Sequence, residues 1–196
     1  MPQSGRGVIE YFEDFLGSEV ALLSTGVLDK IGSLRIIGEG MSETDSGVTI
    51  LESDGLSGVA QFQTTNEADH NIGFATAKCF DVALMGPIVL EGRVRLADLD
   101  TKSVYFGLSD VNEDDVELEA DVISGGTATI TLTASDLCGF FLDSELTDDE
   151  DWHTVYNGGS TTGETVSDNL DVNDDAVAGE FQILRLEVAP NGTAYW

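Results

Sequence analysis

Two acidic segments repeat a spacing of oxygen-bearing side chains that suits a hard cation. Their residues are Asp110, Asn112 and Asp114 in the first segment and Asp171, Asn173 and Asp175 in the second. Alternate carboxylate and amide oxygens in a tight loop are the ligands that calcium takes in proteins. However, Asp115 and Ala176 replace the turning glycine of a helix–loop–helix calcium loop, and its last glutamate is missing. Two calcium sites and two solvated acidic turns are therefore alternative interpretations.

Four aromatic residues form a second group, whose rings could stack against the faces of sugars. They are Trp152, Tyr156, Tyr195 and Trp196. Trp152 and Tyr156 lie beside a predicted acidic turn, so these two are the candidates for the rim of a ligand site. The alternative for most of the four rings is packing in the protein core.

Residue patterns for catalysis are sparse. Nucleophilic catalysis needs a base such as histidine beside a serine or a cysteine. The two histidines, His70 and His153, lie in polar segments and are expected at the surface. Sugar hydrolysis needs two carboxylates that flank the bond, and the alternating pair Glu117 and Glu119 lies in an acidic stretch outside the predicted strands. A zinc site needs several histidines or cysteines at ligand spacing, which the sequence does not show. The sequence therefore predicts a protein that is not an enzyme and has no cofactor, with calcium left open.

The net charge bears on the partners that this protein can have. The chain has 37 acidic residues against 8 basic ones, which gives a formal net charge of -29. Such a surface repels nucleic acid and anionic lipid, because each phosphate contact needs a lysine or an arginine. We therefore expect neither nucleic acid nor a membrane as a partner. A saline habitat, neutralising divalent cations and a basic partner surface are three explanations of the charge, and the sequence does not choose among them.

The sequence shows no pattern typical of export or membrane insertion. No apolar stretch of signal-peptide type follows residues 1–7. No apolar run reaches the roughly 18 residues that a membrane helix needs. We therefore expect the chain to be made in soluble form in a cytoplasm.

The two cysteines, Cys79 and Cys138, lie far apart in the sequence and close to phenylalanines. Two buried thiols are the first interpretation, because free cysteine behaves as a small apolar residue. A disulfide between two sheets is the alternative, and the sequence alone does not establish it.

Apolar residues recur at every second position along much of the chain, which is the period of a strand with one buried face. The clearest case is the segment 88–96, where one face is apolar and the other becomes wetter toward Arg93 and Arg95. Further strands are predicted at 34–37, 48–51, 59–65, 103–108, 127–133, 138–142, 152–156, 181–189 and 193–196. Residues 110–121 and 172–175 are predicted loops. Roughly ten short strands without a repeat of 20 to 50 residues predict an all-β sandwich or barrel.

We expect one domain. Residues 1–31 are predicted to form an N-terminal arm and first strand, and residues 32–196 a β-sandwich. The segment APNGTAYW at 189–196 is typical of a hairpin whose second strand has barely begun. We therefore expect either a sandwich that is incomplete at this end or a last strand that pairs with something outside it.

Three stretches together resemble a known family of β-domains. They are YFEDFLG at 11–17, the segment 73–115 with its YFGLSD strand, and GEFQILRLEVAPNGTAYW at 179–196. They resemble the concanavalin/laminin-G-like jelly rolls found among phage structural proteins. The resemblance implies a jelly-roll-like antiparallel β-sandwich. This fold hosts lectins, hydrolases and inert shells alike, so the fold alone does not give the function.

In the phage setting, the resemblance implies a virion structural protein that decorates the capsid. The expected partner is the major capsid protein or another virion protein, with self-association into a homo-oligomer, and the expected location is the virion. The alternative is a carbohydrate-binding module or adhesin on the same fold, assisted by calcium if the acidic turns bind it.

Overall fold

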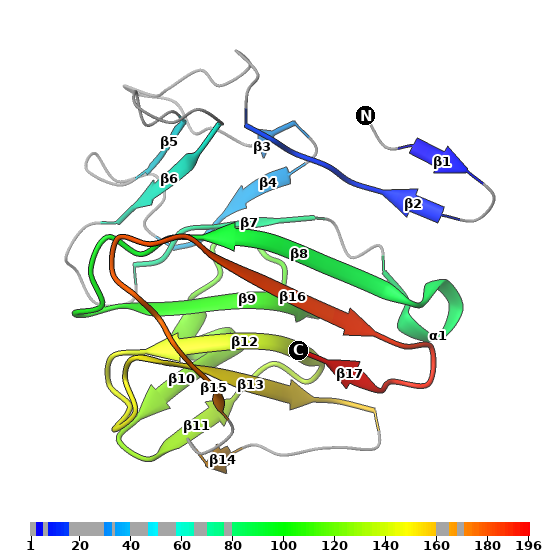
Figure 1. Cartoon of the computed structure of the whole chain (residues 1–196). Helices are drawn as coiled ribbons and strands as arrows, with labels where there is room; N and C mark the ends of the chain where they lie inside the picture. The colour runs from blue at the N-terminus through cyan, green and yellow to red at the C-terminus, as the bar shows by residue number, and fades with distance from the viewer. Residues whose placement is uncertain are drawn as a thin grey trace. The chain divides into compact units, whose positions relative to one another are not determined.

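The computed structural model describes residues 3–5, 8–15, 30–32, 34–39, 47–50, 58–64, 70–76, 80–159, 165–167 and 171–196. Its strands are β1 (Gln3–Gly5), β2 (Val8–Glu10), β3 (Lys30–Ile31), β4 (Leu34–Ile37), β5 (Gly47–Ile50), β6 (Ala60–Gln63), β7 (Gly73–Ala75), β8 (Ile88–Val94), β9 (Ser103–Ser109), β10 (Ile123–Gly126), β11 (Thr129–Leu132), β12 (Leu137–Asp143), β13 (Asp151–Asn157), β14 (Thr165–Ser167), β15 (Asp171–Asp175), β16 (Gln182–Val188) and β17 (Ala194–Tyr195) (Figure 1). The helical elements of these residues are α1 (Val82–Met85) and a π-helical turn at Leu118–Val122. The strands pair into several antiparallel sheets, so the predicted all-β class is confirmed.

The chain divides into two compact units. Unit 1 comprises Met1–Ala77 and Asn112–Glu117, and unit 2 comprises Lys78–Val111 and Leu118–Trp196. This division does not coincide with the predicted boundary between residues 31 and 32.

Unit 2 contains two sheets that share one apolar core. Their strand orders are β15-β13-β12-β9 and β17-β16-β8. The buried residues of the shared core are Cys138, Phe140, Leu142, Trp152, Ala176, Leu184, Leu186 and Val188. Two antiparallel sheets around one core are consistent with a β-sandwich. Unit 2 also holds a three-stranded sheet in the order β10-β11-β14.

The two sheets bury their strands to different extents. All seven residues of β12 are buried, and β12 pairs with β13 on one edge and with β9 on the other. In β16 the buried residues Leu184, Leu186 and Val188 alternate with residues that face away from the core. The neighbouring strand β8 alternates in the same way, with Leu90 and Val94 packed against the core. The period-two pattern therefore gave the correct inward face for β8, whereas in the segment 181–189 it also counted Phe181 and Ile183, which are exposed.

Unit 1 is built from small sheets. Its strand orders are β1-β2, β3-β4-β7 and β5-β6. Phe74 contacts two other rings, with centroid distances of 5.5 Å to Phe15 and 4.5 Å to Phe62. These aromatic pairs have the stacked and edge-to-face geometries that favour packing of small strands.

Several elements differ from the sequence predictions, and three segments show why. The segment 172–175 was predicted as a loop, but it lies in β15 and pairs with β13. Acidic residues are poor strand formers, so backbone pairing at the edge of a sheet overrides local preference here.

Residues 118–121 of the predicted acidic loop begin a π-helical turn that leads into β10, which was not predicted. The single turn α1 was also missed, although Asp81 caps it by accepting a hydrogen bond of 2.9 Å from the Leu84 N–H.

Candidate functional site

A groove of about 540 Å³ opens on unit 2 beside β16. Residues 182–185 of β16 line it together with Asp174 of β15, and Tyr195 and Trp196 follow from the end of the chain. Its volume lies in the range of ordinary ligand sites, roughly 300–1,000 Å³. The groove is therefore the first place to look for a binding function.

Phe140 and Trp152 contribute the buried part of the groove wall. The Trp152 side chain is 1% exposed, and its indole N–H donates a 3.0 Å hydrogen bond to Oε1 of Gln182. The amide of Gln182 in turn donates to the backbone carbonyl of Asp175 at 2.7 Å, so this chain of bonds fixes β16 against the opposite sheet.

The prediction that Trp152 forms the rim of a ligand site is wrong, because this ring is part of the core. Tyr156, the second predicted rim residue, is half-buried and packs against the same core. Neither ring stands free on a loop, because both belong to β13. Packing in the protein core, the alternative interpretation, therefore applies to both residues.

The exposed aromatic side chains at the groove are Tyr195 and Trp196, with exposed fractions of 59% and 42%. The indole N–H of Trp196 donates a 2.9 Å hydrogen bond to the carbonyl of Gly139 in β12. This bond holds the Trp196 ring between the two sheets of unit 2. Both residues belong to the aromatic group that the sequence singled out, so part of that group does lie at a surface groove.

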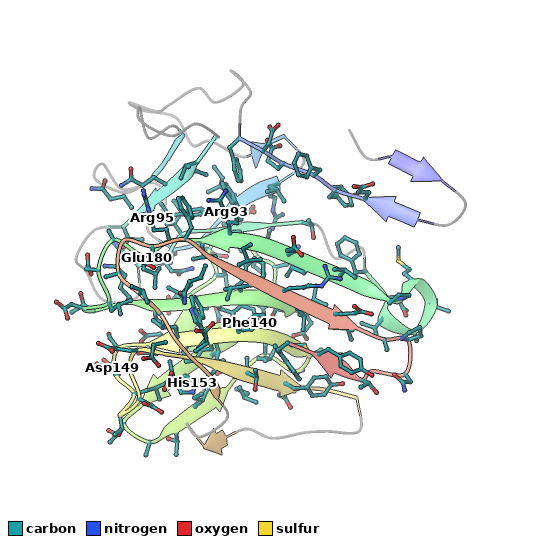
Figure 2. All side chains as sticks on the ribbon, in the orientation of Figure 1. Arg93, Arg95, Phe140, Asp149, His153 and Glu180 are labelled. Atoms are coloured by element: carbon teal, nitrogen blue, oxygen red, sulfur yellow. The ribbon has the colours of Figure 1, made fainter. Side chains whose placement is uncertain are left out.

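The outward face of β8 and β16 is apolar at several positions. Ile183 is 66% exposed and Val89 is 48% exposed, and Phe181 lies just before β16. Arg93 and Arg95 are labelled in Figure 2. Their guanidinium carbons lie 4.5 Å and 4.8 Å from the centroid of the Phe181 ring. We call these five residues the outer patch. Its two arginines gain cation–π contact with the ring, which holds positive charge on an otherwise acidic protein.

Between Val89 and the other residues of the outer patch, an ion-pair network spans β8 and β16. The Arg185 guanidinium lies 2.9 Å from a carboxylate oxygen of Glu91 and 3.7 Å from one of Glu187. Arg185 and Glu91 are direct cross-strand partners. Exposed pairs of this kind contribute little stability, about 1 kcal/mol or less.

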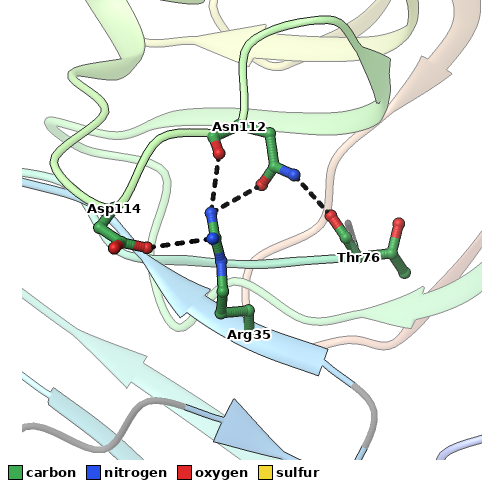
Figure 3. Close-up of polar contacts among 4 residues, drawn as sticks. All are labelled: Arg35, Thr76, Asn112 and Asp114. Atoms are coloured by element: carbon green, nitrogen blue, oxygen red, sulfur yellow. Dashed lines mark hydrogen bonds and ion pairs between the residues drawn. The ribbon is translucent and has the colours of Figure 1, made fainter. Parts of the chain in front are cut away.

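In the first predicted calcium segment, a guanidinium holds two of the side chains (Figure 3). Arg35 of β4 donates to the backbone carbonyl of Asn112 at 2.7 Å and to its side-chain oxygen at 3.1 Å. The other end of the guanidinium lies 3.3 Å from the carboxylate of Asp114. The Asn112 amide also donates to the carbonyl of Thr76. Arg35 thus supplies the positive charge that bridges Asn112 and Asp114.

The third residue of that segment, Asp110, accepts a 3.2 Å hydrogen bond from the backbone N–H of Asp136. This bond belongs to a turn in unit 2 in which the Asp110 N–H also donates to the carbonyl of Asp136 at 2.9 Å. At least one side-chain oxygen of each of these three residues therefore has a protein partner.

The second predicted calcium segment has the backbone of a strand. Asp171, Asn173 and Asp175 lie along β15, and the tight loop assumed for them is wrong. A strand extends by roughly 3.3 Å per residue, so alternate residues spread out instead of curling around one ion. Over the described part of the chain, no group of three or more His, Cys, Asp and Glu residues is placed to hold a metal ion.

A carboxyl cluster nevertheless forms where β13 and β15 meet. Asp151 and Asp175 are cross-strand partners, and the backbone N–H of Asp151 lies 3.5 Å from the carbonyl of Asp148. Burial raises the pKa of Asp151 to about 7, with further contributions from hydrogen bonds and negative charge of Asp175 and Asp148. Asp151 therefore holds a proton close to neutral pH, when ordinary carboxyl groups have lost theirs.

The predicted surface position of His153 is wrong. His153 is fully buried in β13, and its Nε2 lies 3.1 Å from the backbone carbonyl of Asp148. His70 is half-buried in unit 1 and has an interaction partner. The burial of His153 was not predicted, because the acidic residues that precede it are typical of a solvated turn.

Cys138 is a free, buried thiol in β12, as the first interpretation predicts. Burial raises the pKa of the Cys138 thiol to about 12, so the reactive thiolate is disfavoured at neutral pH. Cys79 lies outside the described residues, and the disulfide alternative is therefore not tested.

Comparisons with protein-family models, with curated proteins and with solved structures gave no match to this chain. None of the described helices is long and apolar enough to cross a membrane. The groove, the outer patch and the residue patterns of the sequence are therefore the features that bear on function.

Proposed function

We propose that this chain is a non-enzymatic structural protein of a virion, with a jelly-roll-like fold, that decorates a capsid by docking on the major capsid protein or another virion protein. The proposal is supported by the resemblance of segments 11–17, 73–115 and 179–196 to phage structural jelly rolls. The two-layered, antiparallel arrangement of unit 2 is compatible with that fold.

The observation that carries the proposal is the outer patch. Exposed apolar patches often mark contacts with other proteins. Aromatic and arginine side chains are enriched among the residues that dominate protein interfaces, and the outer patch offers Phe181 with Arg93 and Arg95. Arg93 and Ile183 are direct cross-strand partners in β8 and β16, which holds these two side chains at fixed positions.

The charge of the protein indicates how the patch would select its partner. The chain carries a net charge of -29, so a generally acidic partner is repelled at long range. Arg93 places positive charge in the patch and favours an apolar partner surface with a carboxylate opposite it. A stable contact of this kind would bury well over about 1,000 Å² in total. Self-association into a homo-oligomer remains a prediction, which sedimentation of the purified chain would test.

The test is the protein composition of purified particles. We expect mass spectrometry of gradient-purified virions to detect this chain in a fixed ratio to the major capsid protein. The Val89→Asp variant carries a charge in the outer patch. It should bind about tenfold or more weakly than the parent chain to particles from which this protein is missing, because a desolvated charge is costly at an interface. The matched control is Leu84→Asp in α1, where the side chain is 84% exposed and does not belong to the outer patch. Absence of the chain from particles, or equal effects of both substitutions, would reject the proposal.

A further inference from the structure

We propose that the outward face of β8 and β16 binds the same face of a second copy of this chain, in a weak, two-fold symmetric dimer. This inference rests on the part of the proposed function that concerns self-association. Its tests use the purified chain, so a failure here leaves the location in a virion untouched.

The residues of this face follow from the register of β8 and β16, which lie side by side (Figure 1). In β16 the residues buried in the core alternate with residues that point outward. Cross-strand partners share one face of a sheet, and the outward partners form three rows: Val89 with Glu187, Glu91 with Arg185, and Arg93 with Ile183. Phe181 and Arg95 continue the face, because the Arg95 guanidinium carbon lies 4.8 Å from the centroid of the ring.

The charges of this face are separated along the strands. Glu187 and Glu91 lie at one end, whereas Arg93 lies at the other end with Arg95 beyond it. Between them, the Arg185 guanidinium lies 2.9 Å from a carboxylate oxygen of Glu91 and 3.7 Å from one of Glu187. One cation shared by two carboxylates leaves an excess of negative charge at the acidic end. The face therefore has an acidic end and a basic end.

A face of this kind is complementary to a copy of itself. A two-fold axis that lies in the plane of the contact, perpendicular to the strands, places the basic end of each copy opposite the acidic end of the other. In this arrangement Arg93 of one copy lies opposite Glu91 of the other, and the symmetry forms the same pair a second time. A single favourable pairing is therefore counted twice in the dimer, which is what favours a second copy as the occupant.

Exposed apolar side chains supply the rest of the contact. Val89 is 48% exposed, Ile183 is 66% exposed and Phe181 is 38% exposed. Removal of apolar surface from water is the main driving force of association. The face is only two strands wide, so it buries less than the roughly 800 Å² per partner of a standard interface. We therefore expect a weak dimer, with a dissociation constant on the order of 100 µM.

The net charge of the chain opposes this contact at long range. Two copies that each carry a charge of -29 repel each other, and salt shortens the reach of this repulsion from about 30 Å at 0.01 M to about 8 Å at 0.15 M. Paired side chains in direct contact are screened less than charges spread over the whole surface. The outer patch belongs to the same face, so a virion protein that docks there would displace the second copy.

The first test is sedimentation equilibrium of the full chain at 0.15 M salt, from about 10 µM to about 1 mM. We expect the mass to rise from that of a monomer to that of a dimer and to stop there, because a two-fold contact is closed. A monomer at the highest concentration would overturn the proposal. A mass that continues to rise beyond the dimer would also overturn it, because it indicates an open, head-to-tail contact.

Charge reversal tests which faces meet. Arg93→Glu places like charges opposite each other in both halves of the dimer and should weaken it at least about tenfold. Glu91→Arg should weaken the dimer for the same reason. An equal mixture of the two variant chains restores opposite charges at both positions, and it should dimerise more tightly than either variant alone. Loss of folding in one variant would not be rescued by mixing.

The matched control is Lys102→Glu, which makes the same change of charge just before β9, outside this face. Its ion pair with Asp98 is on the surface, so the variant should fold and should dimerise within about twofold of the parent chain. Equal effects of Arg93→Glu and Lys102→Glu would reject the proposed face, as would a mixture that dimerises no better than the single variants. None of these outcomes bears on the detection of the chain in virions.

Discussion

Strands β12 and β16 have the same length and opposite exposures. Each has seven residues, but β12 is buried at every position and paired on both edges, whereas β16 has one buried face and one face turned to solvent. The comparison indicates that one unit can separate its tasks. We expect the sheet around β12 to supply most of the stability, and the outward face of the sheet around β16 to offer its side chains for the contact proposed above.

The largest expected effect tests the stabilising half of this comparison. Phe141→Ala in β12 should reduce the free energy of unfolding by about 3–5 kcal/mol, because the ring is fully buried and leaves a cavity. Ile183→Ala in β16 should change it by about 0.5 kcal/mol or less, because this side chain faces solvent. Urea unfolding followed by tryptophan fluorescence measures both values, since both tryptophans lie in unit 2. Similar losses for the two variants would remove the distinction between the strands.

A smaller effect is expected where β12 approaches β9 most closely. A Cβ added at Gly139 would lie 2.6 Å from the carbonyl oxygen of Phe106 and 2.8 Å from the Cα of Gly107, and backbone atoms cannot move aside easily. Gly139→Ala should therefore cost about 1–3 kcal/mol of unfolding free energy. Gly126→Ala is the matched control, because no atom lies within 4 Å of the added Cβ. A neutral Gly139→Ala variant would show that the β9–β12 contact is looser than described.

A further effect concerns the edge pair β13–β15 and depends on pH. The pKa of Asp151 is raised to about 7 in the fold, against about 3.9 in an unfolded chain. The folded protein therefore holds more protons between these values, and this residue makes stability fall as pH rises from about 4 to about 7. Asp151→Asn should be more stable than the parent chain at pH 8 and equal to it near pH 4.

Thermal unfolding of the parent chain and the Asp151→Asn variant across this pH range gives the comparison. Asp149→Asn serves as the control, because it removes one negative charge from the same acidic turn on an exposed residue. We expect the gain of the control at pH 8 to be smaller. A difference between Asp151→Asn and the parent that does not change with pH would contradict the raised pKa.

The sequence was informative wherever one face of a strand meets the core. Strands β8, β12 and β16 were predicted because their apolar residues alternate or form a compact run. The wetter face at Arg93 and Arg95 was also predicted from this period, although its contact with Phe181 joins residues far apart in the sequence. Strand β15 could not be predicted, because its acidic residues pair through the backbone at a sheet edge and leave no apolar pattern.

The site was predicted only in part. Of the four aromatic residues singled out as possible ligand contacts, Tyr195 and Trp196 are exposed. Trp152 was assigned to a rim because its acidic neighbours are typical of a turn, although the ring is buried in β13. Asn112 and Asp114 were assigned to calcium because the sequence does not show that Arg35, far away along the chain, bridges them. Long-range partners of this kind are visible only after the chain has folded.

Amide hydrogen exchange in the full chain tests the difference between β12 and β16 most directly. The account predicts that the amides of Phe140 and Phe141 in β12, which is buried and paired on both edges, exchange on the order of a hundredfold or more slowly than those of Ile183 and Arg185 in β16. Equal protection of these four amides would contradict the difference in burial between the two strands.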